Sequence, residues 1–340
     1  MKRLDSVAQL ALILASSLLC LTCSQANKQA PIARQEPVKR YSRDQLPKLT
    51  GLVVPENLPQ LVQRSNRLSA QLVKTLKETA PKVAGIADHQ YCSPNDQVVD
   101  FRSLHLVSPV KDQQECGACW AFATNGVIES SYLAVRNERI SASEQELISC
   151  SSGGSCAGGW WAFDFLMKPG IESDKSYAYE HGDSACRTPL TVEFRALSSG
   201  YVSAAGQENT IPSSSDLKTA MCKHGPLAVA FNATPAFIQF GYDHLDQGAI
   251  FSENDAGKVN HGIVLVGWDE PKQAWIIKNS WNTTWGDQGF LYVKYGTNSI
   301  GLGAAWAEAW PKDYDPAPKV RKLFDTQIKS ALKVSRNDSQ

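Results

Sequence analysis

A cysteine that opens an apolar run is the feature that most restricts how this chain can fold. Cys119 begins the run CWAFA, whose composition predicts a helix that starts at this residue. Unpaired N–H groups and the positive end of the helix dipole favour an anion there, and the thiolate is the nucleophilic form of cysteine. Gln113, six residues earlier, could direct its amide N–H at a developing oxyanion. The alternative is a structural cysteine in a disulfide or in the core.

A cysteine nucleophile also needs a base, and the base needs a partner that orients its ring. His261 lies at the start of the β-branched run 262–268, which is predicted to be a buried strand. Asn279 ends the next predicted strand, 274–278, and a hairpin around Pro271 joins the two. Antiparallel pairing would place the two side chains together, so that Asn279 accepts from one ring nitrogen of His261 and the other nitrogen faces Cys119.

Further motifs follow in a fixed order along the chain. They are PVKDQ at 109–113, SEQEL at 143–147, CAGGW at 156–160, KNSW at 278–281 and WG at 285–286. Together with a histidine 142 residues after Cys119, they resemble the papain-like, cathepsin-type cysteine peptidases over about residues 98–310. The resemblance implies an α+β fold in two lobes, a helical lobe at about 97–205 and an antiparallel, β-barrel-like lobe at about 206–310, with the active-site cleft between them. The expected strands of the second lobe include 227–231, 262–268, 274–278 and 290–294.

The resemblance also assigns roles to the motif residues. Cys119 would attack a peptide carbonyl, and Gln113 with the Cys119 backbone N–H would hold the oxyanion. His261, oriented by Asn279, would protonate the leaving amine and later activate water, so the reaction passes through an acyl-enzyme. Trp281 would shield the His261–Asn279 bond from water. No cofactor or metal is expected.

The substrate-binding residues follow from the same resemblance. The glycines of the CAGGW motif would offer backbone groups to an extended peptide, and apolar residues would form the second subsite. We therefore expect a bulky apolar residue two positions before the cleaved bond. The absence of an inserted loop with paired histidines between Trp161 and Tyr177 favours endopeptidase action. The expected contact residues are Gly158, Gly159, Trp160, Trp161, Ala230, Val259, Asn260, Gly262 and Trp281. Glu115 departs from the small residues common in the family, and could raise the Cys119 pKa or shape the primed side.

Seven cysteines lie outside the N-terminal apolar segment, and spacing alone does not fix their pairing. The resemblance implies the disulfides Cys116–Cys156 and Cys150–Cys186 and leaves Cys119 free. We further expect the two remaining cysteines, Cys92 and Cys222, to pair. The competing interpretation is a four-thiolate zinc site built from Cys116, Cys119, Cys150 and Cys156, which would leave the Gln, His and Asn motifs unexplained.

The regions outside the catalytic domain differ from it in charge. Residues 1–26 have a basic start and a short apolar core, which predicts a signal peptide and export to a secreted, periplasmic or lysosome-like compartment. Residues 27–96 are expected to be a basic pro-region or N-terminal extension, loosely ordered over 30–51 and with an amphipathic helix that ends before Pro81. Residues 92–310 carry 14 Lys/Arg against 24 Asp/Glu, so a basic pro-region suits this acidic domain, either as an inhibitor in cis or as a tether or folding aid.

The basic tail, residues 311–340, predicts an amphipathic helix that packs on its own domain or lies on a membrane surface. No basic patch with interleaved aromatics indicates nucleic acid as a partner, and no second apolar stretch is long enough to span a bilayer. The expected partners are peptide or protein substrates, the pro-region in cis and protein inhibitors. Two other functions use the same residues: acyl transfer by a ligase or transpeptidase, and a binding homologue that has lost catalysis.

Overall fold

A computed structural model describes residues 41, 43–79, 90–203, 206–246, 248–311 and the single residues 322 and 326. The predicted signal peptide and the amphipathic helix predicted in the tail lie outside the described residues, apart from Lys322 and Thr326. No helix among the described segments is long and apolar enough to cross a bilayer.

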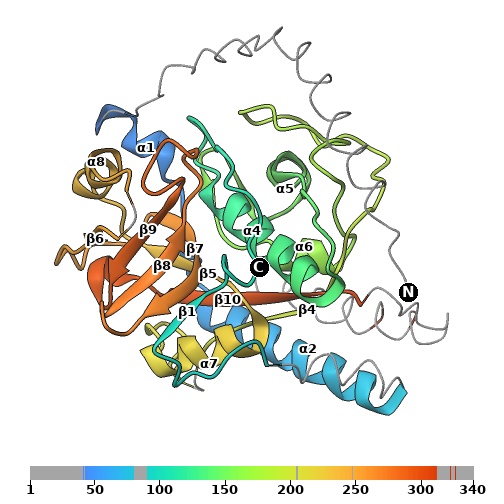
Figure 1. Cartoon of the computed structure of the whole chain (residues 1–340). Helices are drawn as coiled ribbons and strands as arrows, with labels where there is room; N and C mark the ends of the chain where they lie inside the picture. The colour runs from blue at the N-terminus through green and yellow to red at the C-terminus, as the bar shows by residue number, and fades with distance from the viewer. Residues whose placement is uncertain are drawn as a thin grey trace, which may run out of the picture. The chain divides into compact units, whose positions relative to one another are not determined.

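An eight-stranded sheet forms the centre of the described fold (Figure 1). Seven strands follow the order β4-β10-β5-β7-β8-β9-β6, and β1 pairs with the second half of β7. Every pairing is antiparallel except that of β6 with β9. The strands are β1 (Val98–Asp100), β4 (Ala196–Tyr201), β5 (Leu227–Phe231), β6 (Ile250–Phe251), β7 (His261–Asp269), β8 (Ala274–Lys278), β9 (Phe290–Lys294) and β10 (Leu302–Ala309). A two-stranded sheet joins β2 (Gly154–Ser155) and β3 (Gly158–Gly159).

The α+β class is confirmed, but the expected β-barrel-like lobe is only partly right. The sheet is open, since no described residue pairs β4 at one end of the path with β6 at the other. Two of its strands, β1 and β4, also come from residues that were expected to belong to the helical lobe. Neighbouring strands can come from distant parts of a chain, and this long-range pairing leaves no local signal in the sequence.

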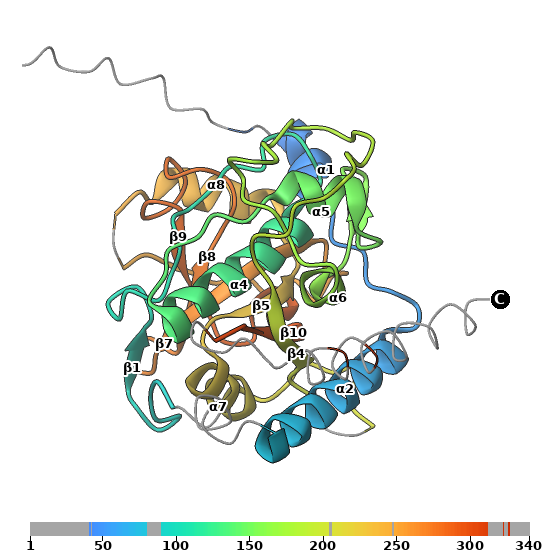
Figure 2. The same ribbon diagram turned by 90° about the vertical axis from the view of Figure 1, so that its right-hand side faces the viewer.

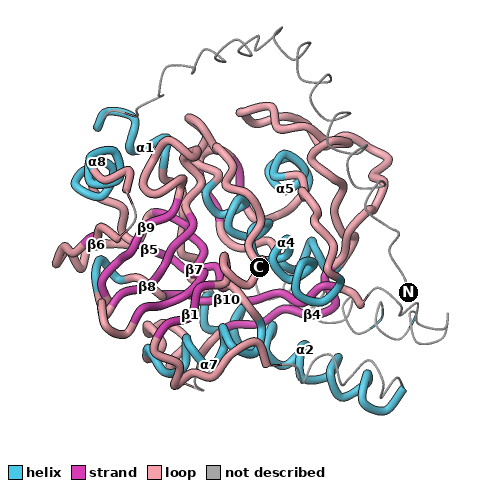
Figure 3. Tube along the Cα trace, viewed as in Figure 1, coloured by secondary structure: helices cyan, strands magenta, loops and turns pink. Residues whose placement is uncertain are grey.

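Helices pack on both faces of the sheet, and Figure 3 shows α7 and α8 apart from the group of α4, α5 and α6. Val264 and Val266 of β7 share a core cluster with α4, whereas Ile263 and Leu265 share the other cluster with α7 and α8. Helix α4 crosses one face of the sheet (Figure 2). All of its first fourteen residues are buried, among them the polar Thr124, Asn125 and Glu129, so the fold encloses this part of the helix. The helices are α1 (Leu46–Leu49), α2 (Leu58–Thr79), α4 (Cys119–Arg136), α5 (Glu144–Cys150), α6 (Phe163–Met167), α7 (Ser214–His224) and α8 (Pro235–Asp243), with 3₁₀ turns η1 (Arg43–Gln45) and η2 (Thr297–Ser299).

The N-terminal extension is more ordered than the sequence predicts. Residues 43–49, expected to be loosely ordered, form η1 and α1, because they pack on the rest of the fold: Leu49 is buried in a core cluster, and Gln45 and Lys48 bond to Glu115. The backbone N–H of Tyr41 donates to the Tyr242 hydroxyl at 3.0 Å, and the Tyr41 hydroxyl donates to Asp112 at 2.8 Å. The amphipathic helix predicted before Pro81 is α2.

Three disulfides brace the fold. They are Cys92–Cys222, Cys116–Cys156 and Cys150–Cys186, the pairs that the sequence analysis expects. Cys119 is the free cysteine of the described chain, and it is buried. Because three of the four candidate ligands are disulfide-bonded, the zinc interpretation is wrong.

Candidate active site

Cys119 is the first residue of α4, as its sequence context predicts. The residue before it, Ala118, provides no side-chain cap, so the N–H groups of the first turn are not satisfied by a capping side chain. The Cys119 side chain is fully buried. Burial raises the pKa of this thiol to about 12, although backbone hydrogen bonding by Gly262, Trp120 and Gly51 opposes the shift. The helix dipole therefore does not decide the thiol's protonation in this state, and the thiol is neutral.

His261 begins β7, and Asn279 directly follows β8. The Nε2 atom of His261 lies 2.8 Å from Asn279 Oδ1, and the histidine ring stacks on Trp281 with ring centroids 4.5 Å apart. The other ring nitrogen, Nδ1, is buried and has no hydrogen-bond partner among the described residues. Burial lowers the pKa of His261 to about 4, against the opposing effect of the bond to Asn279. The imidazole is therefore neutral, with Nε2–H donating to Asn279.

The start of β7 lies directly against the start of α4. A Cβ atom placed on Gly262 would lie 3.2 Å from the carbonyl oxygen of Cys119 and 3.0 Å from the Trp161 ring. A side chain at this position would press on both neighbours. The approach brings the residue that follows His261 against the backbone of Cys119, although 142 residues separate Cys119 from His261 in the sequence.

Hydrogen bonds to Ser280, Cys116 and Leu49 hold the Gln113 side chain near the start of α4. Its Oε1 accepts a bond of 2.6 Å from the Ser280 hydroxyl, and its backbone N–H donates to the Ser280 carbonyl at 2.9 Å. Its Nε2 donates to the carbonyls of Cys116 at 2.9 Å and of Leu49 at 3.0 Å. The amide is thus rigidly aimed, and in this state one of its hydrogens is given to the carbonyl of Leu49.

Residues 49–53, which we call the covering segment, run across these side chains. The indole N–H of Trp281 also donates to the Leu49 carbonyl, at 3.1 Å. The backbone N–H groups of Gly51 and Leu52 both donate to the carbonyl of Asn260, at 2.8 and 2.9 Å. The segment therefore passes from Gln113 and Trp281, over the start of α4, toward the residue that precedes His261.

Beyond Cys119 the covering segment pairs with β3. Gly159 N–H donates to the Gly51 carbonyl at 2.8 Å, and Val53 N–H donates to the Gly159 carbonyl at 2.9 Å, a parallel bridge centred on Leu52. A Cβ on Gly51 would lie 2.0 Å from the Gly117 carbonyl oxygen, so only glycine fits at that crossing. A single glycine in a Pro- and Lys-rich stretch gave no sequence signal for this role.

The expected second-subsite residues lie together. Trp160 and Trp161 pack with ring centroids 4.8 Å apart, and both belong to the same buried cluster as Ala230. Val259 packs against this cluster, and Leu52 of the covering segment lies within it. Trp306 of β10 belongs to the other core cluster and stacks on His224 with ring centroids 3.8 Å apart, so it lies apart from these residues.

Glu115, whose role the sequence left open, faces the N-terminal extension. Its carboxylate lies 2.9 Å from Lys48 Nζ and accepts a bond of 2.6 Å from Gln45. The Lys48 and Glu115 side chains are 61% and 41% exposed, so the pair is accessible to water. The partner lies 67 residues away in the sequence, and no local pattern pointed to it.

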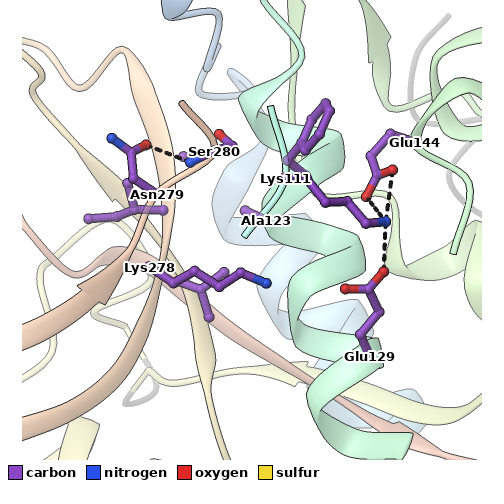
Figure 4. A pocket seen from close by; sticks show the side chains of 11 residues that line it. Lys111, Ala123, Glu129, Glu144, Lys278, Asn279 and Ser280 are labelled. Carbon is purple, nitrogen blue, oxygen red and sulfur yellow. Dashed lines mark hydrogen bonds and ion pairs between the residues drawn. The ribbon is translucent and has the colours of Figure 1, made fainter. Parts of the chain in front are cut away.

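Four charged side chains, three of them buried and Lys111 partly exposed, cluster behind the site (Figure 4). Lys111 Nζ lies 2.8 Å from both Glu129 and Glu144, while Lys278 Nζ donates to the Ser108 hydroxyl at 2.8 Å. Burial lowers the pKa of Lys278 to about 8 and raises that of Glu144 to about 7. Burial alone would also raise the pKa of Glu129, but the charges of Lys111 and Lys278 outweigh it and hold this pKa low.

The comparisons with known proteins agree with this arrangement. A family model described as papain family cysteine protease matches residues 95–308, and the chain belongs to this family. It is 35% identical over 209 residues to digestive cysteine proteinase 3 of Homarus americanus, covering 59% of this chain and 61% of the relative. It is 36% identical over 226 residues to a cathepsin L-like peptidase of Aedes aegypti, covering 63% and 62%. The chain thus spans about three fifths of the length of these curated relatives.

Solved structures give the same family. The bromelain protease from Ananas comosus, in complex with the E64 inhibitor, superposes with a TM-score of 0.55 at 27% identity. That comparison covers 63% of this chain and 99% of bromelain. A cysteine protease from Carica candamarcensis, also in complex with E-64, gives a TM-score of 0.53 at 26% identity and covers 63% of this chain and 98% of its own.

Proposed function

We propose that this protein is a cysteine endopeptidase whose described form is latent. The observation that carries the proposal is the 2.8 Å contact of His261 Nε2 with Asn279, which leaves Nδ1 unpartnered beside a free cysteine at a helix start. A nucleophile, a base and a residue that orients the base are the elements of covalent acyl transfer.

The reaction would proceed once the covering segment leaves. Water then reaches Cys119 and His261, the burial effects on both pKa values relax, and a proton can pass from the thiol to Nδ1. The thiolate attacks the peptide carbonyl, and the oxyanion takes the Gln113 N–H that Leu49 now occupies. The imidazolium gives its proton to the leaving amine. Water, deprotonated by His261, then releases the acyl group and restores the thiol.

Leu52 supports the expected preference for a bulky apolar residue at the second subsite. Its side chain is buried in the cluster that holds Trp160 and Trp161, while the next residue, Val53, is 57% exposed. A substrate with leucine or a similar residue two positions before the cleaved bond would replace Leu52 in the same apolar surroundings.

The position of the covering segment supports latency. The Leu49 carbonyl accepts the Gln113 amide, and the Val53 N–H donates to the Gly159 carbonyl, so the segment spans the proposed oxyanion donor and a glycine expected to bind substrate. It would therefore block the site and act as an inhibitor in cis.

Three disulfides support export to an oxidising compartment, in agreement with the signal peptide expected over 1–26. Peptides or proteins of that compartment would be the substrates, and protein inhibitors that enter the same site would be further partners.

Alkylation of Cys119 tests the proposal. The non-reduced protein is treated with iodoacetamide before and after an added protease removes the covering segment, and the site is mapped by mass spectrometry. We expect slow labelling of the full chain and fast labelling at Cys119 after removal, together with hydrolysis of a peptide carrying leucine at the second subsite. His261→Asn should slow labelling about tenfold or more, because the thiolate loses its partner cation.

His105→Asn is the matched control, since His105 is exposed and Asn tolerates its left-handed φ of 58°. This variant should label like the parent protein. A folded protein without its covering segment, in which Cys119 stays unreactive, would contradict the proposal.

A further inference from the structure

Helix α2 lies upstream of the region that the family model matches, yet it is built into the protease. We propose that α2 is a permanent part of the enzyme that positions the substrate-pocket wall, and that proteolytic maturation cuts the loop 54–57, between the covering segment and α2. The residues before the loop would leave, and α2 would stay.

One face of α2 is part of the main core. The buried positions recur at helical spacing, as expected for a helix packed on a folded domain. Leu58, Leu72 and Leu76 are at most 1% exposed and belong to the cluster that contains Trp120 of the catalytic helix. If α2 were removed, the region that the family model matches, residues 95–308, would expose a broad apolar surface.

Polar side chains of α2 form hydrogen bonds with backbone groups at the edge of the sheet. β4 is the last strand of the sheet path, so its outer backbone groups need partners. Asn66 accepts from the Tyr201 N–H at 2.7 Å and donates to the Tyr201 carbonyl at 3.1 Å, and the Ser65 hydroxyl donates to the Ser199 carbonyl at 3.3 Å. Figure 2 shows α2 beside β4. A side chain that pairs both backbone groups of one residue is a specific docking contact.

A second polar link ties α2 to α6. Arg64 lies 2.7 Å from Asp164, and the two side chains are only 19% and 32% exposed. A charge pair that is largely withdrawn from water is costly to separate. This pair therefore favours retention of the helix.

The same residues connect α2 to the substrate pocket. Tyr201, whose backbone Asn66 holds, accepts a bond of 3.0 Å from the indole N–H of Trp160. Trp160 packs on Trp161, which donates to the Gly303 carbonyl at 2.9 Å. The chain of contacts from Asn66 through Tyr201 to Trp160 makes α2 the support behind the proposed second subsite.

The loop 54–57 differs from both of its neighbours. Glu56 and Asn57 are exposed, whereas Leu52 and Leu58 on either side are buried. The covering segment on its N-terminal side is held by backbone hydrogen bonds and by the buried side chains of Leu49 and Leu52, with the exposed pair Lys48–Glu115 next to it. A short exposed loop between two ordered segments is a preferred place for proteolysis.

Downstream of α2 the chain is anchored again. Tyr91 N–H donates to the Cys222 carbonyl at 2.8 Å, next to the disulfide Cys92–Cys222. A single cut in 54–57 therefore leaves α2 covalently attached to the enzyme, and a second cut in 80–89 would leave it held by the contacts described above.

Retention of α2 can be tested apart from catalysis, although its role in the pocket rests on the proposed function. The full chain carrying Cys119→Ser cannot process itself, so an added endoprotease is used in a time course. The products are separated by native size-exclusion chromatography and identified by denaturing mass spectrometry. We expect fragments that end within 53–57 to separate from the protease, while the fragment with residues 58–79 co-elutes with it even after cuts in 80–89. The opposite result, a free α2 fragment and a remaining protease with an unchanged melting temperature, would overturn the proposal.

A matched pair of variants tests the positioning role. Asn66→Ala leaves both backbone groups of Tyr201 without their side-chain partner, while Gln71→Ala removes an exposed carboxamide from the same helix. In the mature enzyme we expect Asn66→Ala to lower the preference for leucine over alanine at the second subsite by about threefold or more, mainly through KM. Gln71→Ala should leave the preference unchanged. Equal preferences in both variants would contradict the positioning role, while loss of all activity in the parent enzyme would count against the proposed function instead.

Discussion

The side-chain amide of Gln113 donates a hydrogen bond to the carbonyl oxygen of Leu49, 3.0 Å away. The donor proposed to hold the oxyanion of a substrate is thus paired with the chain's own N-terminal extension. Gln113 is completely buried, and its Oε1 is fixed by Ser280. The amide is already oriented in this structure, so under the proposed latency, activation would need removal of the covering segment and no rebuilding of the site.

Gln113→Ala should lower kcat of the mature enzyme by about 10²–10³, the usual cost of one oxyanion donor, with little change in KM. Steady-state kinetics on a peptide with leucine at the second subsite would measure this. Gln114→Asn is the control, because it changes the neighbouring carboxamide at a φ of 52° that Asn tolerates. A kcat that stays within twofold of the parent value would argue against the assigned role.

Glu115→Gln should weaken the attachment of the covering segment. The change removes the charge that faces Lys48 while the shape stays the same. Because the pair is largely exposed, we expect an effect of about 0.2–1 kcal/mol, or up to about fivefold faster release. The measurement is the rate of Cys119 alkylation in the full chain at low salt, and added salt should reduce the difference. Glu78→Gln, an exposed change on α2, should leave the rate unaltered.

Acid should favour opening of the site. The pKa of His261 is lowered to about 4 by burial. We expect departure of the covering segment, which is bonded to the neighbouring Asn260, to expose the ring and return this pKa toward its ordinary value near 6.5. The covered form then binds fewer protons between pH 6.5 and 4, so lowering the pH through this window shifts the equilibrium to the open form. Above pH 6.5 this contribution is absent.

Hydrogen exchange at the amides of residues 51–53 would show this dependence, after correction for intrinsic rates and in a Cys119→Ser background. Opening should increase as the pH falls from 6.5 to 4. The added change His261→Asn removes the titrating group and should flatten the profile. An equally steep profile in that variant would assign the effect to another group.

The sequence predicted the individual strands and helices whose formation depends on residues close together in the chain. The apolar runs at 227–231, 274–278 and 290–294 are strands with those bounds, because β-branched residues in short runs favour a buried strand. The helix that starts at Cys119 and the amphipathic helix before Pro81 followed from composition and spacing in the same way.

The parts that depend on distant contacts were not visible in the sequence. The protonation of Cys119 is an example, because the helix terminus suggested a thiolate while burial keeps the thiol neutral. The covering segment gave no signal either, because all of its contacts join residues that are far apart in the sequence. They are backbone hydrogen bonds, the buried side chains of Leu49 and Leu52, and the crossing at Gly51 that only glycine fits. Likewise, the pairing of Glu115 with Lys48 depends on a fold in which the two segments meet.

The buried charges behind the site lead to the last prediction. Glu129 accepts hydrogen bonds from Lys111 at 2.8 Å, from Ser108 at 2.6 Å and from the Ala142 N–H at 3.0 Å. Lys111 lies two residues before Gln113, and Lys278 directly precedes Asn279, so this cluster joins the two loops that position the oxyanion donor and the residue that orients the histidine. Glu129→Gln preserves the shape but leaves Lys111 and Lys278 with less compensating negative charge.

Breaking a buried pair in this way should lower the free energy of unfolding by about 3–5 kcal/mol. Urea denaturation of the full chain, in a Cys119→Ser background that prevents self-cleavage, would measure the loss. Glu138→Gln is the matched control, because Glu138 pairs with Arg136 near the surface and its change should cost at most about 1 kcal/mol. Equal stabilities of the two variants would show that the buried cluster contributes no more than a surface pair, and the link between the two loops would then need another explanation.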